Sequence, residues 1–377
     1  MNARHPLLAA IWTVLKWILI VLGIVQLVMM AFSLWFFGVI PIPFLTEQAP
    51  KPHAQFAVTG LSPTADRAYL EFAEPGRNLR IGWKDLQTSE VFMLVPKGSD
   101  DVLAAPHSSS DGKKLAVVIK EAAYQYTRSQ IGILDLDRMT YRPITRGEGY
   151  KQLPSFSRDG RKIIYAQSNR VRESGRTRFS QWDFYETDVE TGAMTRLTEF
   201  CFFAVDNPFY LADGERFIFS GEYPSCNFPS PGDKGKYDYY VKIHRENTIF
   251  LRTRDDKSPL TPLFYNGETS HSPLLTDDGR IFFISRTNEM DGIKVGNYNY
   301  DLFVQEHGNI RRLTNLQTFL TSIAVSPAGD IVAYESDKQR NQERTHWILQ
   351  VQDGTTSELT LGDPQSFHIL EVVQGER

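Results

Sequence analysis

The sequence predicts an all-β fold, a six-bladed β-propeller, and three observations point to it. A short polar turn built on Asp-Gly or a similar pair recurs six times along the chain. Each turn is followed by a run of apolar residues, and a second pair of short strands follows most of these runs. Four strands per repeat, repeated six times, are typical of a propeller, in which small sheets stack around an axis.

The turns keep a regular spacing although they differ in composition. Asp-Gly favours a hairpin because Gly accepts positive φ without a Cβ clash and Asp hydrogen-bonds its own backbone. Successive turns, counted from Ala65 to Gly329, lie 47, 48, 54, 65 and 50 residues apart. The clear copies end in Gly112, Gly160, Gly214 and Gly279, and the weaker copies are Ser62-Pro63-Thr64-Ala65 and Ser326-Pro327-Ala328-Gly329.

The segments after the turns, such as Leu115 to Ile119, are almost continuously apolar. A strand of this kind is covered on both faces, as in stacked sheets. The outer strand pairs often end in an apolar residue and Thr, at Ile144-Thr145, Leu197-Thr198, Leu313-Thr314 and Leu359-Thr360. The pattern of residues 367–373 predicts one more strand. In one arrangement this strand completes the first blade. In the other, Gln55 to Thr59 completes the first blade and the C-terminal strand packs outside it.

At these residues a family resemblance emerges. The string SFSRDGRKIIYAQSN, and its relatives at Asp111, Asp213 and Asp278, resemble the WD40-like (PD40) repeat of TolB-type propellers over roughly residues 52–373. The resemblance implies the fold and leaves the activity open, because this fold hosts many unrelated functions. TolB-type proteins carry an α/β domain before the propeller, and we expect none here.

The N-terminal segment predicts a transmembrane signal anchor. Its apolar stretch contains no charge and is longer than the roughly 7–15 apolar residues of a cleaved signal peptide. Arg4 and Lys16 precede the span, so the positive-inside rule places the N-terminus in the cytoplasm and the propeller in the periplasm of a bacterium, at its inner membrane. The predicted parts are a cytoplasmic tail and helix start (1–16), the span (17–40), a Pro-rich linker (41–52) and the propeller (53–377).

Charge and cysteine content narrow the choice of partners and compartment. A formal net charge of −4 argues against nucleic acid as a partner. The two cysteines, Cys201 and Cys226, fall in two loops that a propeller blade places on one face. In an oxidising periplasm we expect a disulfide between them, closing a loop of about 25 residues and worth about 3 kcal/mol. The alternative is a pair of buried free thiols.

The face opposite the Asp-Gly turns is the predicted partner-binding surface. Its long loops span residues 169–181, 222–247, 287–300 and 337–346, and long loops on a rigid scaffold often carry binding. Arg and Tyr are enriched at interfaces. The arginine-rich first loop suits an acidic peptide or lipid head groups. The candidate residues are Arg170, Arg172, Arg176, Arg178, Tyr237, Tyr239, Tyr240, Tyr298, Tyr300, Lys338, Arg340 and Arg344.

Motifs of common enzymes are absent from the sequence. It contains no Gly-x-Ser-x-Gly elbow, no His-Glu-x-x-His, no Cys-x-x-Cys and no phosphate-binding glycine loop. We therefore predict no catalytic residue, cofactor or metal, and a protein-binding or scaffold subunit of a cell-envelope assembly whose partners include membrane proteins. The alternative is a membrane-tethered enzyme with a metal or cofactor in the central channel. Asp206, Asn207, His271 and Asp277 could contribute to such a site.

Overall fold

A computed structural model describes residues 26, 55–73, 79–121, 128–172, 178–222, 247–254, 260, 262–263, 269–287, 300–316, 318–337 and 344–375. The chain divides into two compact units, Met1–His53 and Ala54–Arg377. Only Gln26, which is helical, is described in the first unit. The predicted membrane span, tail and linker therefore lie outside the described residues. Within the described part of the chain, no helix is long and apolar enough to cross a membrane.

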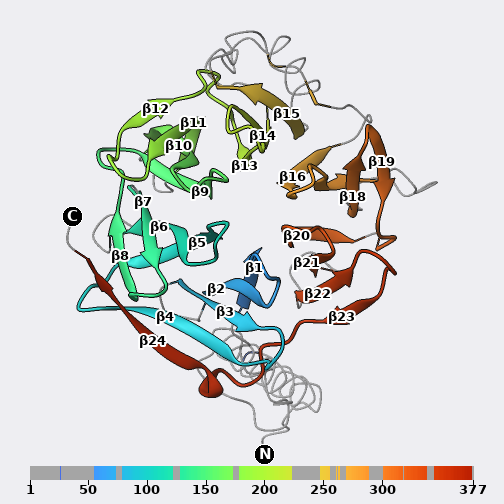
Figure 1. The fold of residues 1–377 in the computed structure, drawn as a ribbon, viewed down its shortest axis with the longest axis horizontal. Helices are drawn as coiled ribbons and strands as arrows, with labels where there is room; N and C mark the ends of the chain where they lie inside the picture. The colour runs from blue at the N-terminus through green and yellow to red at the C-terminus, as the bar shows by residue number, and fades with distance from the viewer. Residues whose placement is uncertain are drawn as a thin grey trace, which may run out of the picture. The chain divides into compact units, whose positions relative to one another are not determined.

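The second unit is built of small antiparallel sheets that surround a central axis (Figure 1). Blade 1 contains β1 (Gln55–Leu61), β2 (Arg67–Ala73), β3 (Arg80–Asp85) and β4 (Val91–Lys97). Blade 2 contains β5 (Val102–Ser108), β6 (Lys114–Lys120), β7 (Gln130–Asp135) and β8 (Thr140–Pro143). Blade 3 contains β9 (Tyr150–Phe156), β10 (Lys162–Arg172), β11 (Arg178–Asp188) and β12 (Met194–Arg196).

The other three blades repeat this order. Blade 4 contains β13 (Val205–Tyr210), β14 (Arg216–Gly221) and β15 (Thr248–Thr253), and its described fourth strand is reduced to a bridge between Phe250 and Pro262. Blade 5 contains β16 (Ser270–Leu275), β17 (Ile281–Arg286), β18 (Tyr300–Glu306) and β19 (Asn309–Arg312). Blade 6 contains β20 (Phe319–Val325), β21 (Ile331–Asp337), β22 (Thr345–Gln350) and β23 (Thr356–Glu358). The prediction of a propeller is confirmed.

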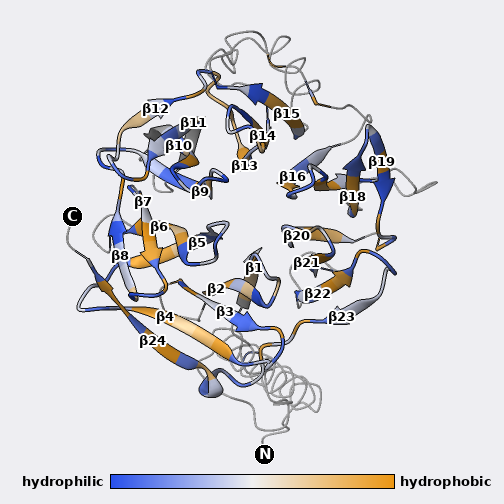
Figure 2. Cartoon of the chain, in the orientation of Figure 1, coloured by the Kyte–Doolittle hydropathy of each residue, from blue (hydrophilic) through white to orange (hydrophobic). Residues whose placement is uncertain are grey.

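The core is divided into slabs that fill the spaces between neighbouring blades. Between blades 3 and 4, for example, Ile164 and Phe184 pack against Phe217 and Phe219. The second strand of each blade contributes to the slab on either side, so it is buried on both faces. Hydrophobic residues lie along the strands of the blades (Figure 2). In β6 every residue from Leu115 to Ile119 is at most 3% exposed. This burial confirms the interpretation of the continuous apolar runs.

The C-terminal strand lies outside blade 1. β24 (His368–Gln374) follows a short 3-10 turn, Pro364–Ser366, and pairs in parallel with β4. Its last two residues pair in parallel with β8, so one continuous sheet joins blades 1 and 2. Of the two predicted arrangements, the structure has the second, in which β1 is the inner strand of blade 1 (Figure 1).

Candidate functional site

One end of the central channel holds a pit that residues of every blade line. The pit has a volume of about 170 Å³ and lies between the inner strands and the Asp-Gly turns. Its wall combines apolar side chains with small hydroxyl residues. Every inner strand contributes to this lining, and its residues there include Leu61, His107, Phe156, Phe209, Leu274 and Val325, in the order of the blades.

Two aromatic rings narrow the channel at this pit. His107 belongs to blade 2 and Phe209 to blade 4, yet their ring centroids are 5.3 Å apart. The His107 Nε2 atom lies 3.5 Å from Ser155 Oγ of blade 3, whereas its buried Nδ1 has no hydrogen-bond partner among the described residues. Burial lowers the pKa of His107 to about 4, so this imidazole is neutral at physiological pH.

The rim of the pit carries one cation and one anion. Arg158 and Asp277 line the pit from the turns of blades 3 and 5, and both residues are exposed. Backbone contacts hold these turns in place: Ser110 donates to the Arg158 carbonyl at 2.9 Å, and the Asp277 N–H donates to the Pro327 carbonyl at 2.8 Å. These contacts hold the backbone of the two turns that carry the charged residues.

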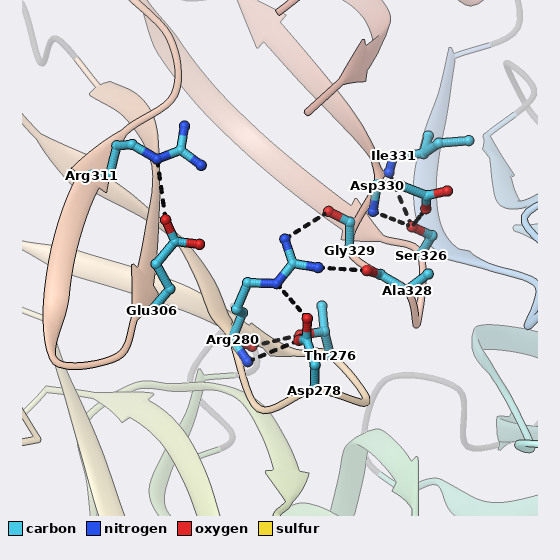
Figure 3. Close-up of polar contacts among 10 residues, drawn as sticks. All are labelled: Thr276, Asp278, Arg280, Glu306, Arg311, Ser326, Ala328, Gly329, Asp330 and Ile331. Atoms are coloured by element: carbon cyan, nitrogen blue, oxygen red, sulfur yellow. Dashed lines mark hydrogen bonds and ion pairs between the residues drawn. The ribbon is translucent and has the colours of Figure 1, made fainter. Parts of the chain in front are cut away.

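At the same end of the channel, the side chain of Arg280 connects the turns of blades 5 and 6, and we call this connection the staple (Figure 3). Arg280 of blade 5 forms an ion pair with Asp278 at 2.8 Å. Its guanidinium also donates to the carbonyls of Ala328, at 2.6 Å, and Gly329, at 3.3 Å, in the turn of blade 6. One side chain thus joins the turns of two neighbouring blades beside the pit.

A hydroxyl and a carboxylate organise most of these turns. In the turns that begin at Ser109, Ser157 and Thr276, the hydroxyl donates to the Asp two residues later at 2.6–2.7 Å. In the two Pro-containing turns, Ser62 and Ser326 donate instead to Asp66 and Asp330, four residues later. The turns that are weak in sequence therefore use the same chemistry with the carboxylate displaced.

The inner strands change direction at a bulge before they reach the pit. The register of each inner strand shifts at this point. In four strands the bulge holds a left-handed residue followed by Pro, with φ of 48° at Ala105, 56° at Leu153, 36° at Asn207 and 53° at Ser272. Such bulges redirect side chains, and strained backbone of this kind concentrates at functional sites.

Two of the proposed channel ligands meet at the bulges of blades 4 and 5. Ser272 Oγ donates to Asp206 Oδ2 at 2.5 Å, and His271 Nδ1 lies 3.0 Å from the same Oγ. Burial raises the pKa of Asp206 and lowers that of His271 to about 4. Asp277 lies in the turn instead. Within the described ranges, no group of three or more metal-binding side chains forms.

The structure places the predicted partner-binding residues in several environments. Arg170, Arg172 and Arg178 lie in strands rather than in a loop that begins at residue 169, because β10 continues to Arg172 and β11 begins at Arg178. Tyr300 is 7% exposed and its ring packs edge-on against His271. The remaining predicted residues outside the described ranges are Arg176, Tyr237, Tyr239, Tyr240, Tyr298, Lys338 and Arg340.

Arg344, whose side chain is 47% exposed, forms an ion pair with the buried Glu335 at a junction that closes the ring of blades. Its Nη1 lies 3.1 Å from Glu335 Oε1, and the other carboxylate oxygen is 3.1 Å from His346 Nε2. That Nε2 also lies 2.8 Å from the Phe56 carbonyl, and the His346 and Phe56 rings stack at 3.7 Å. Blade 6 is thereby joined to β1. Sequence reasoning missed this junction because Phe56 and His346 are 290 residues apart.

Of the predicted disulfide, one cysteine lies within the described residues. Cys201 is buried and lies in the segment that enters blade 4, while Cys226 lies outside the described residues. The pairing therefore stays a prediction.

Comparison with known sequences finds a distant likeness to TolB. No family model matches the chain. The Tol-Pal system protein TolB of Francisella tularensis subsp. mediasiatica (strain FSC147) is 24% identical over 251 residues, covering 66% of this chain and 48% of that protein. Proteins with the same description from other Francisella tularensis strains match to a similar extent. The chain spans about half the length of the curated relatives it matches.

Solved structures give the same likeness at the level of the fold. TolB from Acinetobacter baumannii has a TM-score of 0.55 at 20% identity, covering 80% of this chain and 62% of that one. An oligogalacturonate lyase in complex with manganese has a TM-score of 0.52 at 13% identity, covering 82% and 80%. Because TolB and a lyase share the fold, the fold alone does not decide the function of this chain. Sequence and fold together show distant TolB-like β-propeller homology.

Proposed function

We propose that the chain is a non-catalytic, protein-binding or scaffold subunit of a cell-envelope assembly. In this proposal residues 17–40 hold it in the bacterial inner membrane, and the propeller faces the periplasm. The relatives named as Tol-Pal system proteins support an envelope role, because the likeness to them covers 66% of this chain. Membrane proteins are then among the partners that the anchor would bring within reach.

The size of the pit is the observation that carries this proposal. Its volume of about 170 Å³ is below the roughly 300–1,000 Å³ of pockets that enclose small-molecule ligands. The narrowed channel, apolar wall and charged rim instead suit a single side chain that projects from a partner protein. Interface anchors of this kind fill small desolvated pockets surrounded by a polar rim.

Cross-linking of the full chain in native membranes, followed by identification of its neighbours, tests the proposal. Ala212 is exposed at the mouth of the pit, so Ala212→Trp should fill the mouth and reduce the yield of cross-linked neighbours severalfold. Ala193, an exposed residue in an outer turn of blade 3, provides the matched control Ala193→Trp. Self-association alone, or equal yields from both variants, would contradict partner binding at the pit.

Two further measurements test the non-catalytic role and the membrane anchor separately. The purified full chain is expected to contain no stoichiometric metal, and tightly bound metal would favour the channel enzyme. Alkaline carbonate should leave the chain in the membrane pellet, because a spanning helix resists extraction whereas a peripheral protein does not. Release into the supernatant would remove the anchor from the proposal without bearing on the pit.

A further inference from the structure

The two middle strands of blade 3 extend past the rest of their sheet. β10 and β11 have 11 residues each, whereas the other described strands have at most 7. Pairing with β9 ends at Ser168 of β10, and pairing with β12 begins at Tyr185 of β11. Residues 170–172 and 178–180 therefore pair only with each other among the described strands. We call these residues the arginine ribbon.

The register concentrates positive charge on this ribbon. Arg172 lies directly opposite Arg178 in the antiparallel ladder, and Arg170 precedes Arg172 by two residues on the same strand. Positions two apart share a face of a strand, so the three arginine positions belong to one face. Like charges directly opposite each other destabilise a ladder, and an isolated two-stranded ribbon is at best marginally stable in water. A bound anionic partner would offset the repulsion between like charges, and a partner that adds a strand would also stabilise the two-stranded ribbon.

We infer that the arginine ribbon recognises an acidic, extended polypeptide segment of a partner protein. The inference rests on the proposed function and names the chemistry of its partner. Guanidinium groups pair with carboxylates through two parallel hydrogen bonds. The strand edges beyond β9 and β12 can also accept an added strand through main-chain hydrogen bonds. A peptide uses the charge and these edges together, whereas a lipid head group uses only the charge.

A binding experiment on the detergent-purified full chain tests the inference. The probe is a fluorescent ten-residue peptide of alternating Glu and Thr, and the comparison peptide carries Gln in place of each Glu. The chain should bind the acidic peptide at least about tenfold more tightly, and added salt should weaken that binding. The triple variant Arg170→Gln, Arg172→Gln, Arg178→Gln should lose about tenfold in affinity.

A matched triple variant controls for the loss of net charge. Lys113, Arg138 and Arg161 lie in turns at the opposite face, with side chains 64%, 80% and 83% exposed. Their replacement by Gln should leave peptide affinity unchanged. Equal losses in the two triple variants, or equal binding of the two peptides, would overturn the inference. Ribbon-dependent binding to phosphatidylglycerol vesicles without binding of the acidic peptide would also overturn it, in favour of lipid.

The outcomes distinguish this inference from the proposed function. Neighbours that cross-link equally to the wild type and the ribbon variant would remove the ribbon's role and leave a protein-binding propeller. The absence of any neighbour with either chain would contradict the proposed function itself. Thermal unfolding of the ribbon variant should occur at or above the wild-type temperature, because Arg172 and Arg178 occupy directly opposite positions in the ladder, where like charges are unfavourable. A lower temperature would show that the arginines stabilise the fold instead.

Discussion

Single hydroxyl groups hold the turns at the pit end of the propeller. Ser157 is 4% exposed. Its Oγ donates to Asp159 at 2.7 Å and accepts the Lys162 N–H at 2.9 Å. The hydrogen bond from Ser157, followed by that from the Arg161 N–H, lowers the pKa of Asp159. The turn of blade 4 begins with Leu211-Ala212 and has no such hydroxyl, so a propeller turn can form without it.

Ser157→Ala should therefore destabilise the fold by about 2 kcal/mol, since it removes a hydrogen bond to a carboxylate and leaves a backbone N–H unpaired. It should also raise the pKa of Asp159, which carboxyl NMR titration would detect. Ser110 is exposed and makes one hydrogen bond in the neighbouring turn, so Ser110→Ala should change the free energy of unfolding by less than about 0.5 kcal/mol. Equal effects in urea unfolding would contradict this account of the turn.

Gly329 meets a steric requirement that Gly279 does not. Both have positive φ, +67° and +86°, which strains any L-residue. A Cβ at Gly329 would lie 2.6 Å from Arg280 Nη2, whereas at Gly279 nothing lies within 4 Å. Gly279→Ala should cost about 1 kcal/mol for its backbone conformation. Gly329→Ala should cost about 1 kcal/mol more, because it displaces the staple shown in Figure 3.

A double-mutant cycle isolates this steric term. In the Arg280→Ala background, the difference in unfolding free energy between Gly329→Ala and Gly279→Ala should shrink, because the displaced guanidinium is absent. An unchanged difference would assign the effect to the other close contact of such a Cβ, Thr276 Cγ2 at 2.9 Å, or to the backbone rather than to Arg280.

Among the elements, β24 closes the molecule from outside. Val372 is fully buried in the slab between blades 1 and 2, while the adjacent Val373 is 47% exposed. Val372→Ala should destabilise the fold by about 2 kcal/mol through lost burial, and it should speed hydrogen exchange along β24. Val373→Ala should change stability by less than about 0.5 kcal/mol. Equal losses would show that strand pairing, rather than this buried contact, holds β24 in place.

The blades could be predicted because their information is local. A turn dipeptide followed by an apolar run defines two adjacent strands without reference to distant residues, and the predicted run at Leu115 to Ile119 lies within β6. The parallel pairing of β24 with β4 could not be predicted. It joins segments far apart in sequence, and no turn sets its register.

The Thr of the recurring Leu-Thr pair has a structural role that the sequence pattern alone did not reveal. In blade 3, Thr198 Oγ1 accepts the Phe184 N–H at 2.9 Å and donates to Asp183 at 2.9 Å. The same buried carboxylate receives Arg196 Nη2 at 2.7 Å. Blade 5 has the same set of hydrogen bonds, formed by Asp301, Arg312 and Thr314. The shared Asp followed by Arg-Leu-Thr was a usable signal, because it recurs at similar spacing in two repeats.

The candidate site was predictable only in part, for a related reason. Asp206 and His271 both contact Ser272 Oγ, because they occupy corresponding places on the inner strands of neighbouring blades. The pit itself depends on His107 and Phe209 approaching across the channel. Such contacts between non-adjacent blades depend on the closed ring, so no local sequence pattern encodes them.

Across the whole molecule, two histidines from different blades make stability depend on pH in the same direction. Burial lowers the pKa of both His107 and His271 to about 4, from about 6.5 in an unfolded chain. Between these values the unfolded state binds more protons than the folded state, so the free energy of unfolding falls as the pH drops from 6.5 towards 4. The buried carboxyls of Asp206 and Glu71 have raised pKa values and oppose this trend.

Single substitutions separate the histidine contribution from that of the carboxyls. Between pH 7 and pH 5 each histidine should account for about 2 kcal/mol of lost stability, so His107→Gln should lose about 2 kcal/mol less than the wild type over this interval in urea unfolding. His271→Gln should behave likewise. His368, whose side chain is 51% exposed, provides the control His368→Gln, which should retain the wild-type dependence on pH. If His107→Gln and His368→Gln gave the same slope, the pKa of His107 would have to lie near its unfolded value, and burial would not keep this imidazole neutral at pH 5.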